Sequence, residues 1–277
     1  MPMTILIMID GLRPDAVTPD RCPNFAGVLA RGASTLRARS VVPPVTLPCH
    51  MSVFHSVPPG RHGVTSNEWS PMARPLPGLV DVARSAGLRT AFFYNWEPLR
   101  NVSRPLSLSF SYFRDTAYAF DGDQGTAEVA ARTIARERPD FAFVYFGTVD
   151  SVGHSFGWMS PEYLKQAADV DLTLGVVLDA LPDEASVLIQ SDHGGHDRTH
   201  GADMPEDMTI PWVITGPAIR RGHTLGAPVS LLDTAPTLAR LLGLTPHPEW
   251  EGRCVDEAFV ERLISGQPAT SPPAAPK

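Results

Sequence analysis

The sequence contains little cysteine. Its three cysteines, Cys22, Cys49 and Cys254, lie far apart, are odd in number and form no CxxC pair. Small secreted domains that depend on disulfides instead carry an even and closely spaced set. We therefore expect no disulfide framework, and a protein that works in a reducing compartment, the cytoplasm.

An excess of positive charge is also absent. The formal net charge is −7 at pH 7, whereas proteins that bind bulk nucleic acid present a basic surface. Bulk nucleic acid is therefore not an expected partner. A small phosphorylated substrate remains compatible with this charge, because bound metal ions could supply the positive charge that it needs.

Long hydrophobic runs are missing as well. The first residues, MPMTILIMIDGLRPD, contain one short apolar run that ends at Asp10, without the basic segment and small-residue cleavage site of a signal peptide. This run predicts a buried strand. We expect no membrane partner.

Short apolar runs alternate with helical patterns along the chain. The apolar runs predict buried strands at 4–10, 89–95, 141–150, 186–192 and 210–216. Apolar spacings of three and four predict helices at 22–32, 76–87, 125–139, 160–181 and 230–243. This alternation predicts an α/β fold with a mainly parallel central sheet and helices on both faces.

The predicted elements form one catalytic domain, residues 1–264. Residues 265–277 are rich in Pro, Ala and Ser and predict a disordered tail. The segment 95–123 has no clear period. We expect it to form a small insertion over one face of the sheet, near the active site.

Potential metal ligands follow three of the predicted strands: Asp10, then Asp150 and His154, then Asp192, His193, His196 and His200. The carboxyl ends of parallel strands meet at one edge of the sheet, where ligands bind. A single aspartate at a strand end is usually a helix cap. Three such ends, two of them followed by histidines, favour a metal site.

These donors suit zinc, and also manganese or iron. Their number exceeds one tetrahedral site and predicts two adjacent ions, an arrangement that can hold both the attacking and the leaving oxygen of a phosphoryl displacement.

The segment PPVTLPCH supplies a nucleophile. Pro48 lies two residues after Thr46, and proline favours the first turn of a helix, so Thr46 or Leu47 lies at the N-terminus of a helix, which we expect to be amphipathic. Amides at a helix N-terminus favour an alkoxide and a bound phosphate. The alternative is that Thr46 merely caps the helix. Of the histidines that follow, His50 could approach the site, while His55 and His62 are expected to be structural.

Five motifs in a fixed order carry a family resemblance: MIDGLRPD, PPVTLPCH, GRHGVTSNEW, FGTVDSVGHSFGW and SDHGGHDRTHG. Together they resemble the alkaline phosphatase superfamily, and within it the type I phosphodiesterase/nucleotide pyrophosphatase branch, over roughly residues 4–255.

The resemblance implies a role for each matched residue. One metal ion would be surrounded by Asp10, Thr46, Asp192 and His193. The other would be held by Asp150, His154 and a later histidine. Zinc is the expected metal and manganese the alternative. Asn67 would donate a hydrogen bond to a phosphate oxygen; the alternative is a turn residue.

The later histidine is expected to be His200, with His196 as the alternative. Only two histidines lie beyond it, both in Pro/Gly-rich segments that predict exposed loops. If it is not a ligand, His196 would support the site or contact the substrate. Gly194 and Gly195 would permit a sharp backbone path between the ligands.

The resemblance implies hydrolysis of a small phosphodiester or pyrophosphate. Thr46 would attack in line to give a phospho-threonine, which water then hydrolyses. Phosphomonoesterase activity and phosphonoacetate hydrolase-like C–P cleavage stay open, as does a catalytically silent metal-binding relative. The presence of Thr46 with Asn67 favours diester hydrolysis and disfavours a silent relative. The CxPxR-type sulfatase motif is absent, since Cys49 is followed by HMS.

Overall fold

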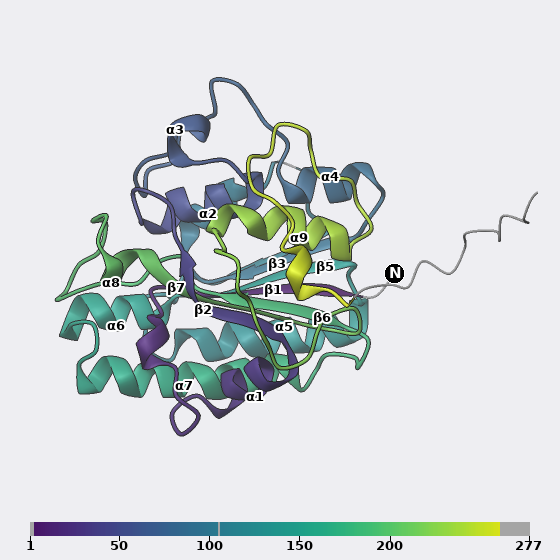
Figure 1. Ribbon diagram of the computed structural model, residues 1–277. Coiled ribbons are helices and arrows are strands. Elements are labelled where there is room, and N and C mark those ends of the chain that lie inside the picture. Colours follow the sequence, from purple (N-terminus) through teal and green to yellow (C-terminus); the bar gives the residue numbers. More distant parts are fainter. Residues whose placement is uncertain (1–2, 105, 261–277) are drawn as a thin grey trace, which may run out of the picture.

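One eight-stranded sheet forms the centre of the molecule (Figure 1). The computed structural model describes residues 3–104 and 106–260, and the tail expected at 265–277 lies outside them. The strands are β1 (Thr4–Ile9), β2 (Ala33–Arg39), β3 (Thr90–Tyr94), β4 (Phe110–Phe113), β5 (Phe141–Phe146), β6 (Ser186–Gln190), β7 (Thr209–Thr215) and β8 (His223–Thr224). Their order in the sheet is β4-β3-β5-β1-β6-β7-β2-β8.

Most neighbouring strands run parallel. β1 pairs in parallel with β5 and β6, β3 does so with β4 and β5, and β2 with β8. Of the strands that the structure describes, β7 runs antiparallel to both of its neighbours, β6 and β2. The prediction of an α/β fold with a mainly parallel sheet is confirmed.

Helices cover both faces of the sheet. The helices are α1 (Pro23–Arg31), α2 (Thr46–His55), α3 (Pro59–His62), α4 (Leu79–Ser85), α5 (Gly122–Glu137), α6 (Thr148–Phe156), α7 (Pro161–Leu178), α8 (Pro205–Met208) and α9 (Thr234–Leu241). Short 3-10 helices are η1 (Pro14–Ala16), η2 (Glu97–Val102), η3 (Leu231–Asp233) and η4 (Asp256–Ala258). In Figure 1, α2, α3, α4 and α9 lie on one face, and α1, α5, α6 and α7 on the other. Within the described ranges, no helix has both the length and the hydrophobicity that crossing a membrane requires.

The core consists of two hydrophobic layers, one on each side of the sheet. Side chains alternate along a strand, so Leu6 and Met8 of β1 belong to one layer while Ile5, Ile7 and Ile9 belong to the other. The first layer also takes in α2, in which every residue is buried. The expectation of an amphipathic helix after Thr46 is therefore wrong, because neighbouring elements cover α2 on all sides.

The strand predicted at 141–150 is shorter than expected. β5 ends at Phe146, Gly147 follows, and α6 begins at Thr148. Asp150 therefore lies in the first turn of a helix rather than at a strand end. The apolar pattern alone did not separate the two elements, because Val149 continues the run of β5 and is itself buried.

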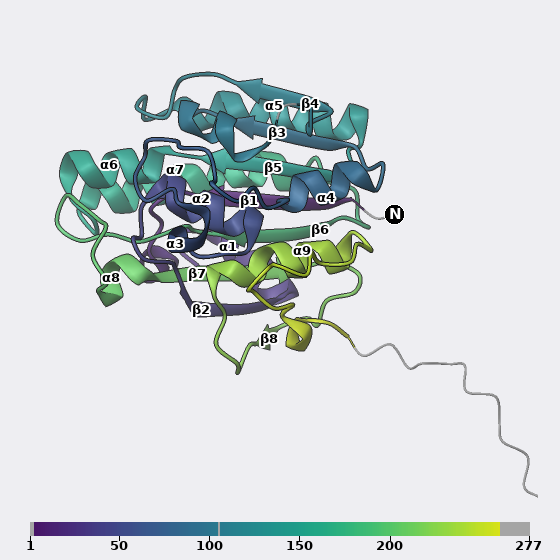
Figure 2. The ribbon, with the colours of Figure 1, turned by 90° about the horizontal axis from the view of Figure 1, so that it is seen from above.

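The segment 95–123 lies only in part over a face of the sheet, where η2 contacts α2. Its central part forms β4, which pairs in parallel with β3 and extends the sheet at one edge (Figure 2). β2 and β8, which the sequence analysis also missed, lie together near the opposite edge. Several side chains of β2 are exposed, as are two of the four in β4, so neither segment shows the continuous apolar run of a central strand.

Candidate active site

A cluster of three buried side chains lies where β1 and β6 end. Asp10 follows β1, and Asp192 and His193 follow β6; parallel pairing of these strands brings the three residues together. His193 Nε2 lies 3.3 Å from Asp10 Oδ1 and 3.5 Å from Asp192 Oδ2. Their ligand atoms are close enough to share one metal ion.

A second cluster contains Asp150, His154 and His200. Asp150 and His154 lie one turn apart on α6 and so project from the same side of the helix. Asp150 Oδ1 lies 3.5 Å from His154 Nε2 and 3.6 Å from His200 Nε2. This cluster is more open than the first, because the His154 side chain is 44% exposed.

The two clusters adjoin. The rings of His193 and His200 stack with their centroids 3.8 Å apart and their planes inclined by 16°. Gly11, the residue after Asp10, also lets the two clusters lie close together. A Cβ on Gly11 would lie only 3.0 Å from the Cα of Asp150. Gly11 also has a φ of 67°, in the left-handed region that favours glycine.

Backbone carbonyls hold the Nδ1 atom of each of the three histidines, so that Nε2 faces the carboxylates. Nδ1 of His193 donates to the carbonyl of Gly194 at 2.8 Å, and Nδ1 of His200 to that of Pro44 at 2.8 Å. Nδ1 of His154 has the carbonyl of Arg198 at 3.0 Å. Because a carbonyl only accepts, each neutral ring keeps its lone pair on Nε2, as a metal ligand requires.

The pKa shifts in the two clusters agree with neutral histidine rings. Burial lowers the pKa of His193 well below its usual value and that of His200 to about 4, so both rings are neutral near pH 7. Burial also raises the pKa of Asp10 and Asp150 well above the usual value and that of Asp192 to about 7, and repulsion between these carboxyl groups adds to the rise. Bound cations would offset both the burial of the charged carboxylates and the repulsion between them.

Among the residues that the structure describes, three buried carboxylate oxygens have no hydrogen-bond partner: Asp10 Oδ1, Asp150 Oδ1 and Asp192 Oδ2. Such oxygens are costly to bury unpaired. Each faces an imidazole lone pair rather than a donor, an arrangement that a cation between them would satisfy. The residues of both clusters therefore fit a pair of divalent metal ions.

Thr46 lies beside the first cluster. It is the first residue of α2 and is 3% exposed, and its Oγ1 lies 3.2 Å from His193 Nε2. The N-cap position belongs to Val45, so the alternative that Thr46 merely caps the helix is wrong. His50, one turn along, lies within the site as the sequence suggested: its Nδ1 donates to the Thr46 carbonyl at 2.7 Å and lies 3.7 Å from Asp192 Oδ2.

Asn67 lies at the same helix end. Its Oδ1 accepts a hydrogen bond of 3.0 Å from the backbone amide of Leu47, the residue after Thr46. This bond fixes the side chain beside the nucleophile candidate and leaves the amide nitrogen able to donate to another acceptor. Asn67 is thus more than a turn residue in the segment TSNEW.

His196 does not join either cluster. Its Nδ1 lies 2.7 Å from Oδ1 of Asp207, a fully buried residue of α8 that the sequence analysis missed. The Asp207 carboxylate also accepts from the amide of Ala202, and the backbone carbonyl of Asp207 accepts from the amide of Gly194. Asp207 therefore holds the loop that connects His193 to His200.

Gly194 and Gly195 have a different role from the one expected. Neither has a φ in the left-handed region. A Cβ at Gly194 would lie 2.1 Å from the carbonyl oxygen of Glu206, and one at Gly195 would overlap the indole of Trp158. Close packing, rather than a sharp backbone path, requires glycine at both positions.

Asp123 supports the second cluster and was also missed. Its carboxylate accepts from Asn95 Nδ2 at 2.7 Å and from the backbone amides of Gly147 and Thr148 at 2.9 and 3.1 Å. It thereby caps the N-terminus of α6, the helix that carries Asp150. No local pattern separates this residue from an ordinary acidic residue in the first turn of a helix.

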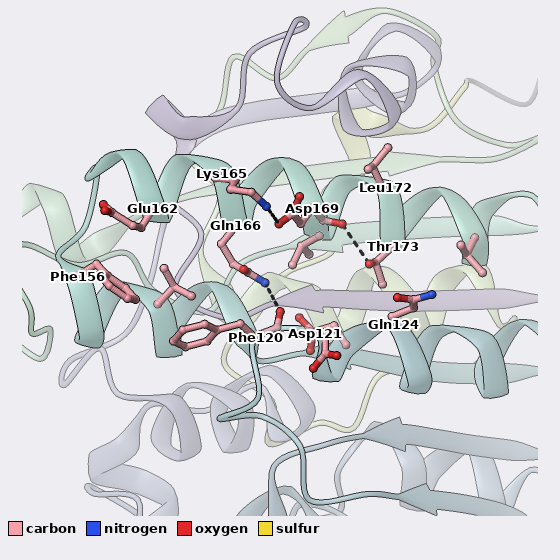
Figure 3. A pocket seen from close by; sticks show the side chains of 14 residues that line it. Phe120, Asp121, Gln124, Phe156, Glu162, Lys165, Gln166, Asp169, Leu172 and Thr173 are labelled. Carbon is pink, nitrogen blue, oxygen red and sulfur yellow. Dashed lines mark hydrogen bonds and ion pairs between the residues drawn. The ribbon is translucent and has the colours of Figure 1, made fainter.

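A cavity of about 750 Å³ lies between α5, α6 and α7 (Figure 3). Gln166 crosses it and donates to the carbonyl of Phe120 at 2.7 Å. None of the candidate metal ligands, Thr46 or Asn67 lines this cavity. This cavity is therefore separate from the candidate active site, which lies at the strand ends.

A family model described as type I phosphodiesterase/nucleotide pyrophosphatase matches residues 4–206. Ectonucleotide pyrophosphatase/phosphodiesterase family member 1 of Rattus norvegicus is 24% identical over 226 residues, covering 70% of this chain and 24% of that protein. Family member 7 of Homo sapiens is 26% identical over 226 residues, covering 69% of this chain and 47% of that protein. The alignments thus span from about a quarter to a half of the length of these curated relatives.

Among solved structures, an inactive threonine-to-alanine variant of murine ectonucleotide pyrophosphatase/phosphodiesterase 5, in complex with AMP, superposes with a TM-score of 0.77. The sequences are 16% identical, and the match covers 94% of this chain and 100% of that chain. At this identity the likeness shows the fold. Because the family model spans most of the chain, this protein belongs to the type I phosphodiesterase/nucleotide pyrophosphatase family, and hence to the alkaline phosphatase superfamily that its motifs resemble.

Proposed function

We propose that this protein is a metal-dependent hydrolase that cleaves a small phosphodiester or pyrophosphate, with Thr46 as the nucleophile. The observation that carries the proposal is the position of Thr46. Its hydroxyl lies at a helix N-terminus and 3.2 Å from the Nε2 atom of His193. A threonine that only stabilised the helix would have no need of this contact.

The residues would hold two divalent ions, one at Asp10, Thr46, Asp192 and His193, the other at Asp150, His154 and His200. Imidazole and carboxylate donors favour zinc, with manganese as the alternative. When bound, such ions would lower the pKa of the threonine hydroxyl and neutralise charge on the phosphate.

In the first step, the Thr46 oxygen forms a bond to phosphorus while the bond to the leaving oxygen breaks on the opposite side. The leaving group takes up a proton, and phospho-threonine results. In the second step, a water oxygen attacks phosphorus, the bond to Thr46 breaks, and the threonine regains its proton. Asn67 would donate to an equatorial oxygen, where negative charge gathers.

Two further observations support this assignment. A neighbour with the same fold is an inactive threonine-to-alanine variant that binds AMP, consistent with an essential threonine in that protein. Asn67 is a neutral donor, which suits a diester with a single negative charge better than a monoester dianion.

The test is Thr46→Ala, assayed together with metal content. We expect loss of turnover with both metal equivalents largely retained, because the other ligands remain, and loss of the acid-stable phospho-threonine that rapid quenching should trap in the wild type. Full activity in Thr46→Ala would exclude this nucleophile.

A substrate panel separates the alternatives. Bis-p-nitrophenyl phosphate, p-nitrophenyl phosphate, phosphonoacetate and a sulfate ester are each assayed with zinc and with manganese. We expect preference for the diester. Preference for the monoester or for phosphonoacetate would move the assignment to those activities, and no turnover of any compound would favour a binding-only relative.

A further inference from the structure

One side chain outside the two clusters contacts all three segments that carry their carboxylate and histidine ligands. This side chain is Trp158, which lies two residues after the end of α6 and is 7% exposed. Its indole Nε1 donates a hydrogen bond of 2.9 Å to the carbonyl of Gly11, the residue after Asp10. The ring also packs edge-on against His154 of α6 and His200 of the loop after β6. One indole thus connects the end of β1, α6 and this loop.

Two glycines let the indole lie directly against the backbone. A Cβ on Gly153, the residue before His154, would lie 2.7 Å from the ring, and a Cβ on Gly195 would lie 2.3 Å from it. Both separations are far below contact distance, so any side chain at either position would displace the ring. The indole therefore fixes the position of α6 relative to the loop after β6. The ligands that these two segments carry are fixed relative to each other in the same way.

Gly11 extends the effect of Trp158 to the first cluster. The Gly11 amide donates to Asp192 Oδ1 at 3.2 Å. Its carbonyl accepts from the indole of Trp158 and from the hydroxyl of Tyr163, at 2.9 and 2.8 Å. Asp10 is joined to Gly11 by the chain, and Asp192 is joined to it by the amide. A hydrogen bond that fixes Gly11 therefore holds both carboxylates of the first cluster.

Tyr163 shares only part of this arrangement. Its hydroxyl is the second donor to the Gly11 carbonyl. Within the described ranges, its ring lies against Trp158 and makes no ring contact with His154 or His200. Tyr163 thus supports the first cluster through Gly11, whereas Trp158 contacts both clusters. The comparison provides a way to separate the two effects.

We propose that Trp158 is a positioning residue shared by the two metal sites. Its N–H acts on the first site through Gly11, and its ring acts on the second through His154 and His200. The separation of the two ions matters because together they hold the attacking and the leaving oxygen of the displacement. This inference rests on the proposed function, since it requires that both clusters bind an ion.

The first experiment measures zinc affinity rather than turnover. Trp158→Phe keeps an aromatic ring but loses the N–H that reaches Gly11, whereas Trp158→Leu loses both the N–H and the ring. Equilibrium dialysis of the full chain against chelator-buffered zinc, followed by metal analysis, gives the affinity for each ion. Loss of one neutral hydrogen bond should weaken the first site by about 5-fold in Trp158→Phe. Trp158→Leu should weaken both sites.

Single-site backgrounds assign each effect to one cluster. In His200→Ala, which should keep only the first ion, Trp158→Leu and Tyr163→Phe should each lower zinc affinity by about 5-fold. In Asp192→Asn, which should keep only the second ion, Trp158→Leu should again lower zinc affinity, by about 10-fold. Tyr163→Phe should have no effect there. An effect of Trp158→Leu in one background alone would overturn the proposal.

Trp250→Phe is the matched control for a purely structural role. Trp250 is also nearly buried, and its Nε1 donates to the carbonyl of Pro77 at 2.9 Å, outside both clusters. Trp158→Phe and Trp250→Phe should both lower the free energy of unfolding, and only Trp158→Phe should lower zinc affinity. Equal zinc affinities in the two variants would contradict the proposal.

The wild-type titration separates this inference from the proposed function. If the wild type binds neither zinc nor manganese, the metal pair of the proposed function is wrong, and the inference is wrong with it. If the wild type binds two equivalents and the Trp158 variants bind them with unchanged affinity, the inference alone is wrong.

Discussion

The indole of Trp158 occupies the space that a side chain at Gly195 would need. A Cβ on Gly195 would lie 2.3 Å from the indole, well inside contact distance. Trp158 in turn packs edge-on against His154 and His200, with centroid separations of 5.0 and 5.8 Å. The glycine that follows DHG in the sequence therefore determines where two candidate ligands of the second metal ion lie.

Gly195→Ala should accordingly displace Trp158 and disturb the second cluster. We expect a loss of roughly 1–3 kcal/mol in the free energy of unfolding, as for other overpacked sites, and a lower activity. Urea unfolding and kcat/KM measure the two effects. Gly60→Ala is the control, since a Cβ there meets nothing within 4 Å; equal effects of both substitutions would argue against the packing explanation.

His200 and His196 belong to the same loop but should respond differently to substitution. His200→Ala removes a candidate ligand atom, Nε2, that lies 3.6 Å from Asp150 Oδ1, so we expect loss of about one metal equivalent and a fall in kcat/KM of at least ~100-fold. His196→Asn weakens only the bond to Asp207 and should cost at most ~10-fold. Metal analysis and kinetics distinguish the two, and a larger loss in His196→Asn would reverse the assignment.

The structural bond of Asn67 to Leu47 and its proposed donation to phosphate can be separated by one pair of variants. Asn67→Asp keeps an oxygen for the amide of Leu47 but loses the donor and adds a negative charge near the phosphate. We expect kcat/KM to fall by about 100-fold or more, since loss of one donor to a transition-state oxygen has this effect in other enzymes. Thermal stability should stay near the wild-type value. Asn67→Ala should lose both activity and some stability.

Acid should destabilise the protein in part through His62. Burial lowers the pKa of this ring to about 4 from its usual 6.5, and the ring accepts from the amide of Val64 and bonds to Ser52 Oγ. As the pH falls, the His62 ring therefore binds a proton in the unfolded state before it does so in the folded state. The stabilisation is complete above pH 6.5 and is lost towards pH 4; it amounts to about 2 kcal/mol between pH 8 and pH 5.

The matching variant is His62→Gln. Its free energy of unfolding should fall less steeply than that of the wild type between pH 8 and pH 5. Urea unfolding at both pH values provides the comparison, and parallel pH profiles would show that His62 does not contribute. The difference between the two proteins cancels the effects of other groups that titrate in this range.

Local patterns were sufficient for the central part of the fold. Strands buried on both faces are continuous apolar runs, and so β1, β3, β5, β6 and β7 were predicted close to their observed positions. β2, β4 and β8 were missed because strands near an edge keep polar, exposed side chains. The antiparallel direction of β7 was also beyond local sequence, since it depends on how the chain returns to the sheet.

The sequence by itself determined which side chains are available for the chemistry: carboxylates and histidines after apolar runs, and Thr46 before a proline-containing helix. Only the tertiary structure decided how they meet. It placed Asp150 inside a helix, brought His200 rather than His196 to it, and supplied Asp123 and Asp207 as supports. The physical reason is that these choices depend on hydrogen bonds and packing between segments far apart along the chain, which local spacing does not record.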